Sequence, residues 1–324
     1  TNGRGDSFEQ YPAWSRDGRL IAFVDWTDQG LGRLMTVGAN GGTPRAVTSQ
    51  PGHYARPAFS PDGRTLVFER GQGGYLTSDR YSSDPGIYRV ALAGGTPVRV
   101  SKEGALPQFG AGDDRIFMAV TAQGKRQLVS TDLNGQARRT HATGEMVNEF
   151  DVSPDGRFVA FRQNYQAFVM PLLPGTQDVS TDQKGGPLPV TRVSQDGADF
   201  IHWSRGGQAL HWSLGPTLYS AETSAFFASA PAGENAPKFQ PPRTGVALGM
   251  EVPADKPTGT VALTGARIVT MAGADGGIID NGVIVIRGDR IVAVGPAVSV
   301  QVPAGARTIN VTGKIIIPGL VDAH

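Results

Sequence analysis

The chain has 324 residues, 39% of them hydrophobic, which is enough for two domains whose cores need no covalent crosslink. Its 30 basic and 29 acidic residues give a formal net charge of +1 without a dense Lys/Arg run, which argues against a nucleic-acid partner. The absence of cysteine excludes disulfides and thiolate metal sites, and no apolar run approaches the roughly 20 residues of a membrane helix.

A repeat organises the first two thirds of the chain. Pro12–Phe23 is echoed by Pro57–Phe68 about 45 residues later, and Glu149–Phe161 is a third clear copy. Weaker copies cover residues 107–117 and 200–212. Five units can therefore be counted.

The Ser-Pro-Asp-Gly core of the repeat predicts a tight turn between two strands. Pro61 presets φ at the first turn position, Asp62 tolerates the second, and Gly63 can adopt the left-handed conformation that closes a hairpin. A second hairpin follows in most units, as in Leu34–Val47, where Asn-Gly-Gly supplies the turn. Four strands at this period are typical of a β-propeller blade, which buries its faces only by stacking on neighbouring blades.

These repeats resemble the PD40 repeats of TolB-like β-propellers over residues 8–222. The resemblance implies an all-β fold of about six blades, five of them countable. We expect the remaining blade to be completed by residues upstream or by a strand near Thr244–Val252.

The expected domain boundaries follow from changes in composition. Residues 1–230 are assigned to the propeller, and residues 231–254, which begin in an Ala/Pro/Ser-rich stretch, to a linker or crossing strand. Residues 255–312 contain short β-branched runs with turns at Asn281-Gly282 and Gly288-Asp289, which predict a small β-sandwich. Residues 313–324 form a continuously apolar run, as expected for the first strand of a parallel (β/α)8 barrel, truncated at His324.

The ending Pro-Gly-Leu-Val-Asp-Ala-His after a small β-module resembles the amidohydrolase superfamily, including its imidazolonepropionase-like and prolidase-like members. The resemblance implies that His324 is the first ligand of a divalent metal, with zinc as the expected ion, and that Asp322 helps to orient it. Catalytic residues are expected in the rest of the barrel. We therefore expect the chain to be one piece of a longer polypeptide, with the barrel as its bound partner.

Two functions from different classes stay open at this point. In the first, a periplasmic or secreted metal-dependent hydrolase cleaves amide, cyclic amide or peptide-like C–N bonds with metal-activated water, and the propeller shields or gates the site. In the second, the propeller is a scaffold that binds proteins or peptides, with no catalysis in this chain. The expected substrate is a small amide or peptide, and self-association into a homo-oligomer is left open.

The remaining histidines predict structure rather than chemistry. His202 and His211 each precede a tryptophan in paired strands, which favours packing or hydrogen bonding within a blade. His53 and His141 are expected in loops. Tyr75–Pro85 is a polar insertion that either overhangs an active site or covers a blade edge.

Overall fold

The computed structural model describes residues 7–71, 84–179, 189–227, 239–254, 256–273 and 276–322, so the predicted loop Tyr75–Pro85 lies almost entirely outside the described residues. The chain divides into two compact units, residues 1–249 and 250–324. The prediction of an all-β fold is confirmed, because β-strands dominate both units and the described residues contain one α-helix, α1 (Thr223–Phe226). No helix among the described residues is long and apolar enough to cross a membrane.

The first unit contains five separate sheets, each built mainly from antiparallel strands that follow one another in sequence. Blade one consists of β1 (Phe8–Trp14), β2 (Leu20–Thr27), β3 (Leu31–Gly38) and β4 (Arg45–Ala46). Blade two consists of β5 (Tyr54–Phe59), β6 (Thr65–Arg70), β7 (Gly86–Ala91) and β8 (Val98–Ser101). Blade three consists of β9 (Ala105–Phe109), β10 (Arg115–Ala122), β11 (Lys125–Asp132), β12 (Arg139–Gly144) and the added parallel strand β16 (Gln177–Asp178). Blade four consists of β13 (Val147–Val152), β14 (Phe158–Gln163), β15 (Gln166–Pro171) and β17 (Thr191–Arg192). Blade five consists of β18 (Asp199–Ser204), β19 (Ala209–Leu214), β20 (Thr217–Glu222) and β21 (Val246–Ala247).

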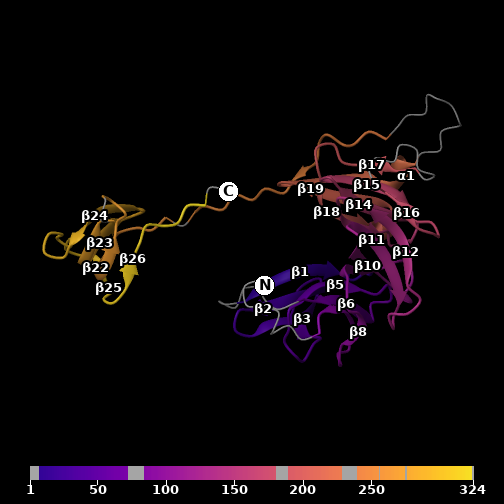
Figure 1. The fold of residues 1–324 in the computed structure, drawn as a ribbon, viewed down its shortest axis with the longest axis horizontal. Helices are drawn as coiled ribbons and strands as arrows, with labels where there is room; N and C mark the ends of the chain where they lie inside the picture. The colour runs from indigo at the N-terminus through magenta and orange to yellow at the C-terminus, as the bar shows by residue number, and fades with distance from the viewer. Residues whose placement is uncertain are drawn as a thin grey trace. The chain divides into compact units, whose positions relative to one another are not determined.

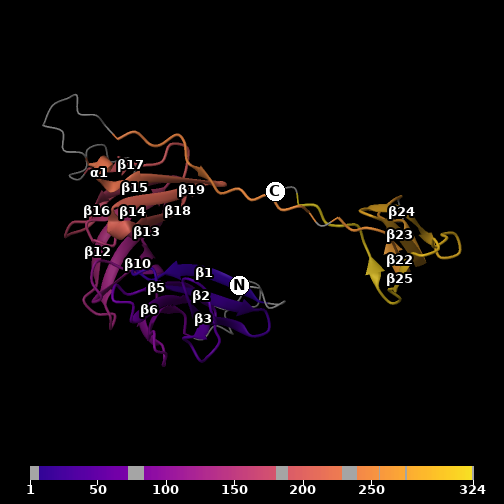
Figure 2. The ribbon, with the colours of Figure 1, turned by 180° about the vertical axis from the view of Figure 1, so that it is seen from behind.

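The five countable repeats therefore correspond to five blades, which follow one another as the colour passes from indigo to orange in Figure 1 and, from behind, in Figure 2. The segment Thr244–Val252 does not begin a sixth blade. It supplies β21, which pairs with β20 as the outer strand of blade five. Among the described residues of this unit there is no sixth sheet, so the expectation of about six blades is not met there.

The apolar core of this unit lies between the blades. Four clusters of buried side chains each join two successive blades, beginning with Val24 of blade one against Phe68 of blade two and ending with Val169 of blade four against Trp212 of blade five. Buried aromatic and aliphatic side chains contribute most of the stabilisation of such interfaces. The inference that blade faces are covered by neighbouring blades is confirmed.

Serine side chains complete the repeated turns. Ser60 Oγ donates to Asp62 Oδ1 at 2.6 Å and accepts from the backbone N–H of Thr65 at 3.0 Å, while Gly63 has the predicted left-handed φ of +70°. The same serine-to-aspartate bond recurs at 2.6 Å in blade one and 2.5 Å in blade four. The aspartate in these turns is therefore fixed by a neighbouring hydroxyl, a role that turn propensities alone did not reveal.

Arg16 links three blades through these turns. It replaces the proline found in Ser-Pro-Asp-Gly, and its guanidinium donates to the carbonyl oxygen of Pro154 at 3.1 Å and to that of Gly110. Burial lowers the pKa of Arg16, and the nearby Asp113 carboxylate opposes that shift. One cationic side chain thus holds the turns of blades one, three and four together.

We expect Arg16→Ala to lower the free energy of unfolding by about 1–2 kcal/mol, because two charge-assisted hydrogen bonds between blades are lost. Thermal and urea denaturation would measure the change. Arg64→Ala is the matched control, since Arg64 is exposed and pairs with Asp62 of its own turn; its effect is expected to stay within about 0.5 kcal/mol. Equal effects of the two substitutions would contradict the linking role.

The described residues of the second unit form one five-stranded sheet, so the small β-sandwich stays a prediction. Its strands are β22 (Thr260–Val269), β23 (Ile278–Arg287), β24 (Arg290–Pro296), β25 (Arg307–Asn310) and β26 (Ile315–Ile316). Bulges around Gly265, whose φ is +88°, let the first half of β22 pair with β25 and its second half with β26. Two apolar clusters flank this sheet, and because one contains Val283 and Val285 of β23 and the other Ile284, they lie on opposite faces.

The predicted barrel strand over residues 313–324 is formed only at Ile315–Ile316, where β26 adds to the edge of this small sheet. Leu320 and Val321 are 93% and 92% exposed, so the described part of this apolar run is not covered on both faces. The barrel start therefore stays a prediction, as do the domain boundaries at residues 230, 254 and 312.

Candidate functional site

A pocket of about 310 Å³ lies where the innermost strands of all five blades meet. Each of β1, β5, β9, β13 and β18 contributes to its wall. The lining residues with polar side chains are Tyr11, Arg56, Gln108, Glu149, Asp151 and His202. This volume lies at the lower end of the range found for small-ligand sites.

A β-bulge in every innermost strand sets which side chains face the pocket. The register shifts in β1, β5, β13 and β18, and β10 shifts against β9. Tyr11, Arg56, Leu106 and Phe200 adopt left-handed φ values between +49° and +54° near these shifts. Bulges turn side chains and are common beside functional sites.

Asp151 occupies a position that recurs in each blade, two residues before the start of the turn. Blades one and two carry Ala13 and Ala58 there, whereas blades three and five carry Gln108 and His202. The side chains on either side of this position are buried in blades two to five, which leaves this one toward the pocket. Aligning the repeats at this position would have picked out the polar residues that sequence reasoning missed.

The backbone around Asp151 is held from both neighbouring blades. Gln108 Nε2 donates to the carbonyl oxygen of Phe150 at 2.7 Å, and the N–H of Val152 donates to Gln108 Oε1 at 2.6 Å. From blade five, Trp203 Nε1 donates to the carbonyl oxygen of Asp151 at 3.0 Å. These hydrogen bonds fix the backbone position from which the Asp151 side chain extends.

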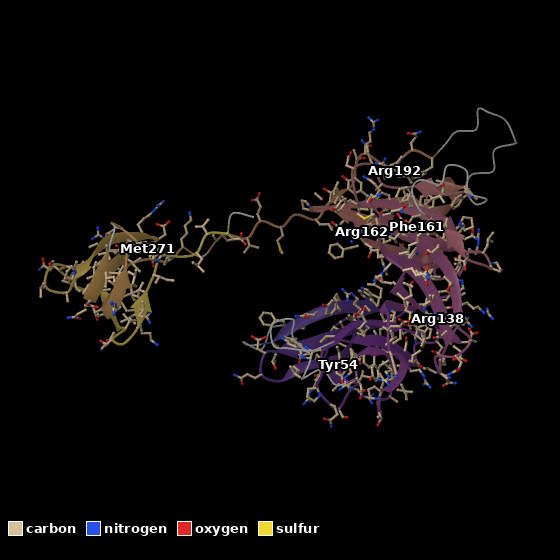
Figure 3. The ribbon with its side chains drawn as sticks, in the orientation of Figure 1. Tyr54, Arg138, Phe161, Arg162, Arg192 and Met271 are labelled. Carbon is tan, nitrogen blue, oxygen red and sulfur yellow. The ribbon has the colours of Figure 1, made fainter. Side chains whose placement is uncertain are left out.

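Carboxylates outnumber cationic side chains on this side of the pocket. Arg162, labelled next to Phe161 in Figure 3, lies with Nε 3.1 Å from Glu149 Oε1 and also contacts the Asp199 carboxylate. Burial raises the pKa of Glu149, Arg162 lowers it, and Asp199 raises it further. One guanidinium is therefore shared between two carboxylates.

Asp151 has no cationic partner among the described residues. Burial and, to a smaller extent, the charge of Glu149 raise the pKa of its carboxyl group to about 8, against the opposing effect of a backbone hydrogen bond from Trp203. Such strongly shifted groups in pockets concentrate at functional sites.

On the opposite side of the pocket, Arg56 already has a carboxylate partner. Arg56 Nη1 pairs with Glu69 Oε2 at 3.0 Å, and Glu69 Oε1 also accepts from the N–H of Leu106 at 2.6 Å. The Arg56 guanidinium lies over the ring of Tyr11, 5.5 Å from its centroid. Arg126 of β11 also lies near Glu69 and Arg56, whose charges act on it in opposite directions, so Glu69 faces two guanidinium groups whereas Asp151 faces none among the described residues.

Of the two site residues predicted from the sequence, Asp322 is among the described residues and His324 is not. His324 is outside the described residues, and Asp322 lies in an exposed segment after β26. No three His, Asp or Glu side chains in the described part of the chain are grouped so that they could hold a metal ion. The described residues therefore do not test the predicted zinc site, which stays a prediction.

The other histidines divide between structural roles and the pocket. His211 is bonded to Ser204 Oγ at 2.6 Å and Ser220 Oγ at 2.7 Å, as a packed histidine should be. The prediction of packing is wrong for His202, which is exposed and lines the pocket. His53 lies outside the strands as expected, but His141 lies in β12, where Ser130 Oγ contacts it at 2.7 Å and burial lowers its pKa to about 4.

Comparisons with known proteins relate both parts of the chain to families. A family model described as the PD40 TolB beta propeller domain matches residues 4–172. The crystal structure of TolB from Acinetobacter baumannii is similar with a TM-score of 0.51 and 20% identity, covering 67% of this chain and 52% of that chain. At this identity the likeness shows the fold alone.

Two curated relatives are enzymes by name. An imidazolonepropionase from Sphingopyxis alaskensis is 44% identical over 61 residues, which is 19% of this chain. The uncharacterized peptidase YuxL from Bacillus subtilis is 25% identical over 161 residues, or 49% of this chain. The chain spans 15% of the length of the first relative and 22% of the second.

Proposed function

Because the chain belongs to the PD40 family of TolB β-propeller domains, we propose that its propeller binds or admits ligands for a metal-dependent amidohydrolase of which the chain is the N-terminal part. The observation that carries the hydrolase half of the proposal is the 44% identity to an imidazolonepropionase over 61 residues. The expected substrates are small amides, cyclic amides or peptides with a scissile C–N bond. A periplasmic or secreted location belongs to the same proposal.

The metal is part of this proposal rather than of the described site. His324 would be a zinc ligand and Asp322 would orient it, with the remaining ligands and the catalytic residues in the rest of the hydrolase barrel. The described residues supply no step that runs through the metal. Their own contribution is the pocket between the five blades, which can select what binds.

The second candidate is a propeller that acts as a binding scaffold without catalysis. The pocket at the centre of the five blades favours it, because polar side chains from several blades converge there beside apolar walls, as in ligand-binding sites. In this case the partner is a protein or peptide held by the propeller.

Metal removal separates the two candidates. Native mass spectrometry and elemental analysis of the purified protein would first show whether a barrel-sized polypeptide and a divalent metal accompany it. Hydrolysis of an amide and dipeptide panel is then expected to disappear on chelation and return with zinc. His324→Ala is expected to lower the rate by at least about a hundredfold, while the control His53→Ala, outside the pocket, is expected to leave it unchanged. Hydrolysis that survives metal-free dialysis would overturn the metal-dependent hydrolase.

A further inference from the structure

We propose that the pocket between the five blades binds the positively charged amino group of a peptide and that the Asp151 carboxylate accepts its hydrogen bonds. This inference deepens the proposed binding role of the propeller and rests on it. It does not depend on the hydrolase assignment.

The charge balance of the described residues identifies the sign of the ligand. Glu149 and Asp199 share the guanidinium of Arg162, and Arg56 is already paired with Glu69, so Asp151 is left without a cationic partner among the described residues. A cation in the pocket would supply the missing positive charge. An anion would meet no unpaired cationic group among the described lining residues.

The position of Asp151 suits ligand binding better than packing. Its backbone is fixed by Gln108 on one side and Trp203 on the other, so the carboxylate needs little reordering when a ligand arrives. A carboxyl group that only stabilised the blade would be paired or replaced by an apolar side chain, as at Ala13 and Ala58.

The shape of the pocket indicates what carries the amino group. Pro57, Pro107 and Ile201 also line the pocket and are themselves buried, so apolar walls adjoin the carboxylate. An amine on a short aliphatic body matches this combination of one charge and apolar walls. A peptide N-terminus and a lysine side chain both offer it, and the experiment separates them.

Equilibrium binding to the full chain tests the proposal. Calorimetry or ligand-observed NMR at pH 7.5 would compare Leu-Gly-Gly with its N-acetylated form, and Nα-acetyl-lysine amide with the neutral Nα-acetyl-norleucine amide. We expect at least one charged probe to bind about tenfold or more tightly than its neutral counterpart. Whichever pair shows the difference identifies the source of the amine.

Asp151→Asn is expected to weaken binding of that charged probe by about tenfold or more. Asp25→Asn is the matched control, because Asp25 is a partly buried carboxylate of β2 outside the pocket, and it should leave binding unchanged. A thermal melt of each variant verifies folding. Equal binding of charged and neutral probes, no binding of either charged probe at about 10 mM, or wild-type affinity in a folded Asp151→Asn variant would each overturn the proposal. None of these results bears on chelation-sensitive hydrolysis, so the two proposals fail separately.

Discussion

Replacing Phe161 by alanine is expected to lower the free energy of unfolding by about 3–5 kcal/mol. Phe161 of β14 is 1% exposed and belongs to the apolar cluster between blades three and four. Its ring lies 5.3 Å from that of Phe168 and 6.1 Å from that of Phe150. Removing it leaves a cavity that rigid strands on both sides cannot close.

The substitution is also expected to weaken ligand binding in the pocket. Phe150 lies between Glu149 and Asp151 on β13, so loss of its aromatic neighbour loosens the strand that carries both carboxylates. Urea denaturation would measure stability, and the amine-binding assay would measure the pocket.

Tyr165→Ala is the matched control for Phe161→Ala. Tyr165 is an aromatic residue of the same blade but is 78% exposed, and its loss is expected to change stability by less than about 0.5 kcal/mol. A loss of less than about 1 kcal/mol for Phe161→Ala would contradict the packing assigned to this cluster.

The turns and the number of countable blades could be predicted because they depend on local chemistry. Pro61, Asp62 and Gly63 act within four residues, and the repeat places each such turn one blade further along. The Ser60 hydroxyl and the anchor at Arg16 were missed for different reasons. The first is a side-chain bond that propensities do not encode, and the second joins residues 138 positions apart.

The pocket could not be predicted from any one strand. Whether Asp151 faces a neighbouring blade or the pocket depends on the bulge in β13 and on the side chains of Gln108 and Trp203 from two other blades. Only a comparison of equivalent positions across the five repeats carries that signal.

The C-terminal run shows the opposite difficulty. Continuous apolar character predicts a strand with both faces covered, but a strand also needs neighbours on its edges. Among the described residues the neighbouring strand is β22, and Ile315–Ile316 is the part of the C-terminal run that pairs with it. In the described part of the chain the run therefore forms a strand only at Ile315–Ile316, and the barrel strand stays a prediction.

Asp151→Asn is expected to change how stability depends on pH, because the pKa of Asp151 is raised to about 8 in the folded protein. An unfolded aspartate titrates near about 4, so between these values the folded state holds a proton that the unfolded state has lost. Wild-type stability is thus highest below about pH 4, as far as this group is concerned, and falls as pH rises toward about 8. The asparagine variant does not titrate at this position, so its stability does not fall in this way as pH rises.

We therefore expect the variant to be more stable than wild type by about 2–4 kcal/mol at pH 9 and to lose that advantage toward pH 4. Thermal unfolding from pH 4 to 9 would measure the difference, with Asp25→Asn expected to run parallel to wild type. The groups around Asp151 that titrate or carry charge are Glu149 on its own strand, Arg162 on β14, His202 on β18 and Arg56 on β5. If the difference in stability between the variant and wild type stayed constant from pH 4 to 9, another group would be neutralising the charge of Asp151 in the unliganded protein. A growing difference would mean that the propeller bears an ionised carboxyl it does not need for folding, which a cationic ligand would neutralise.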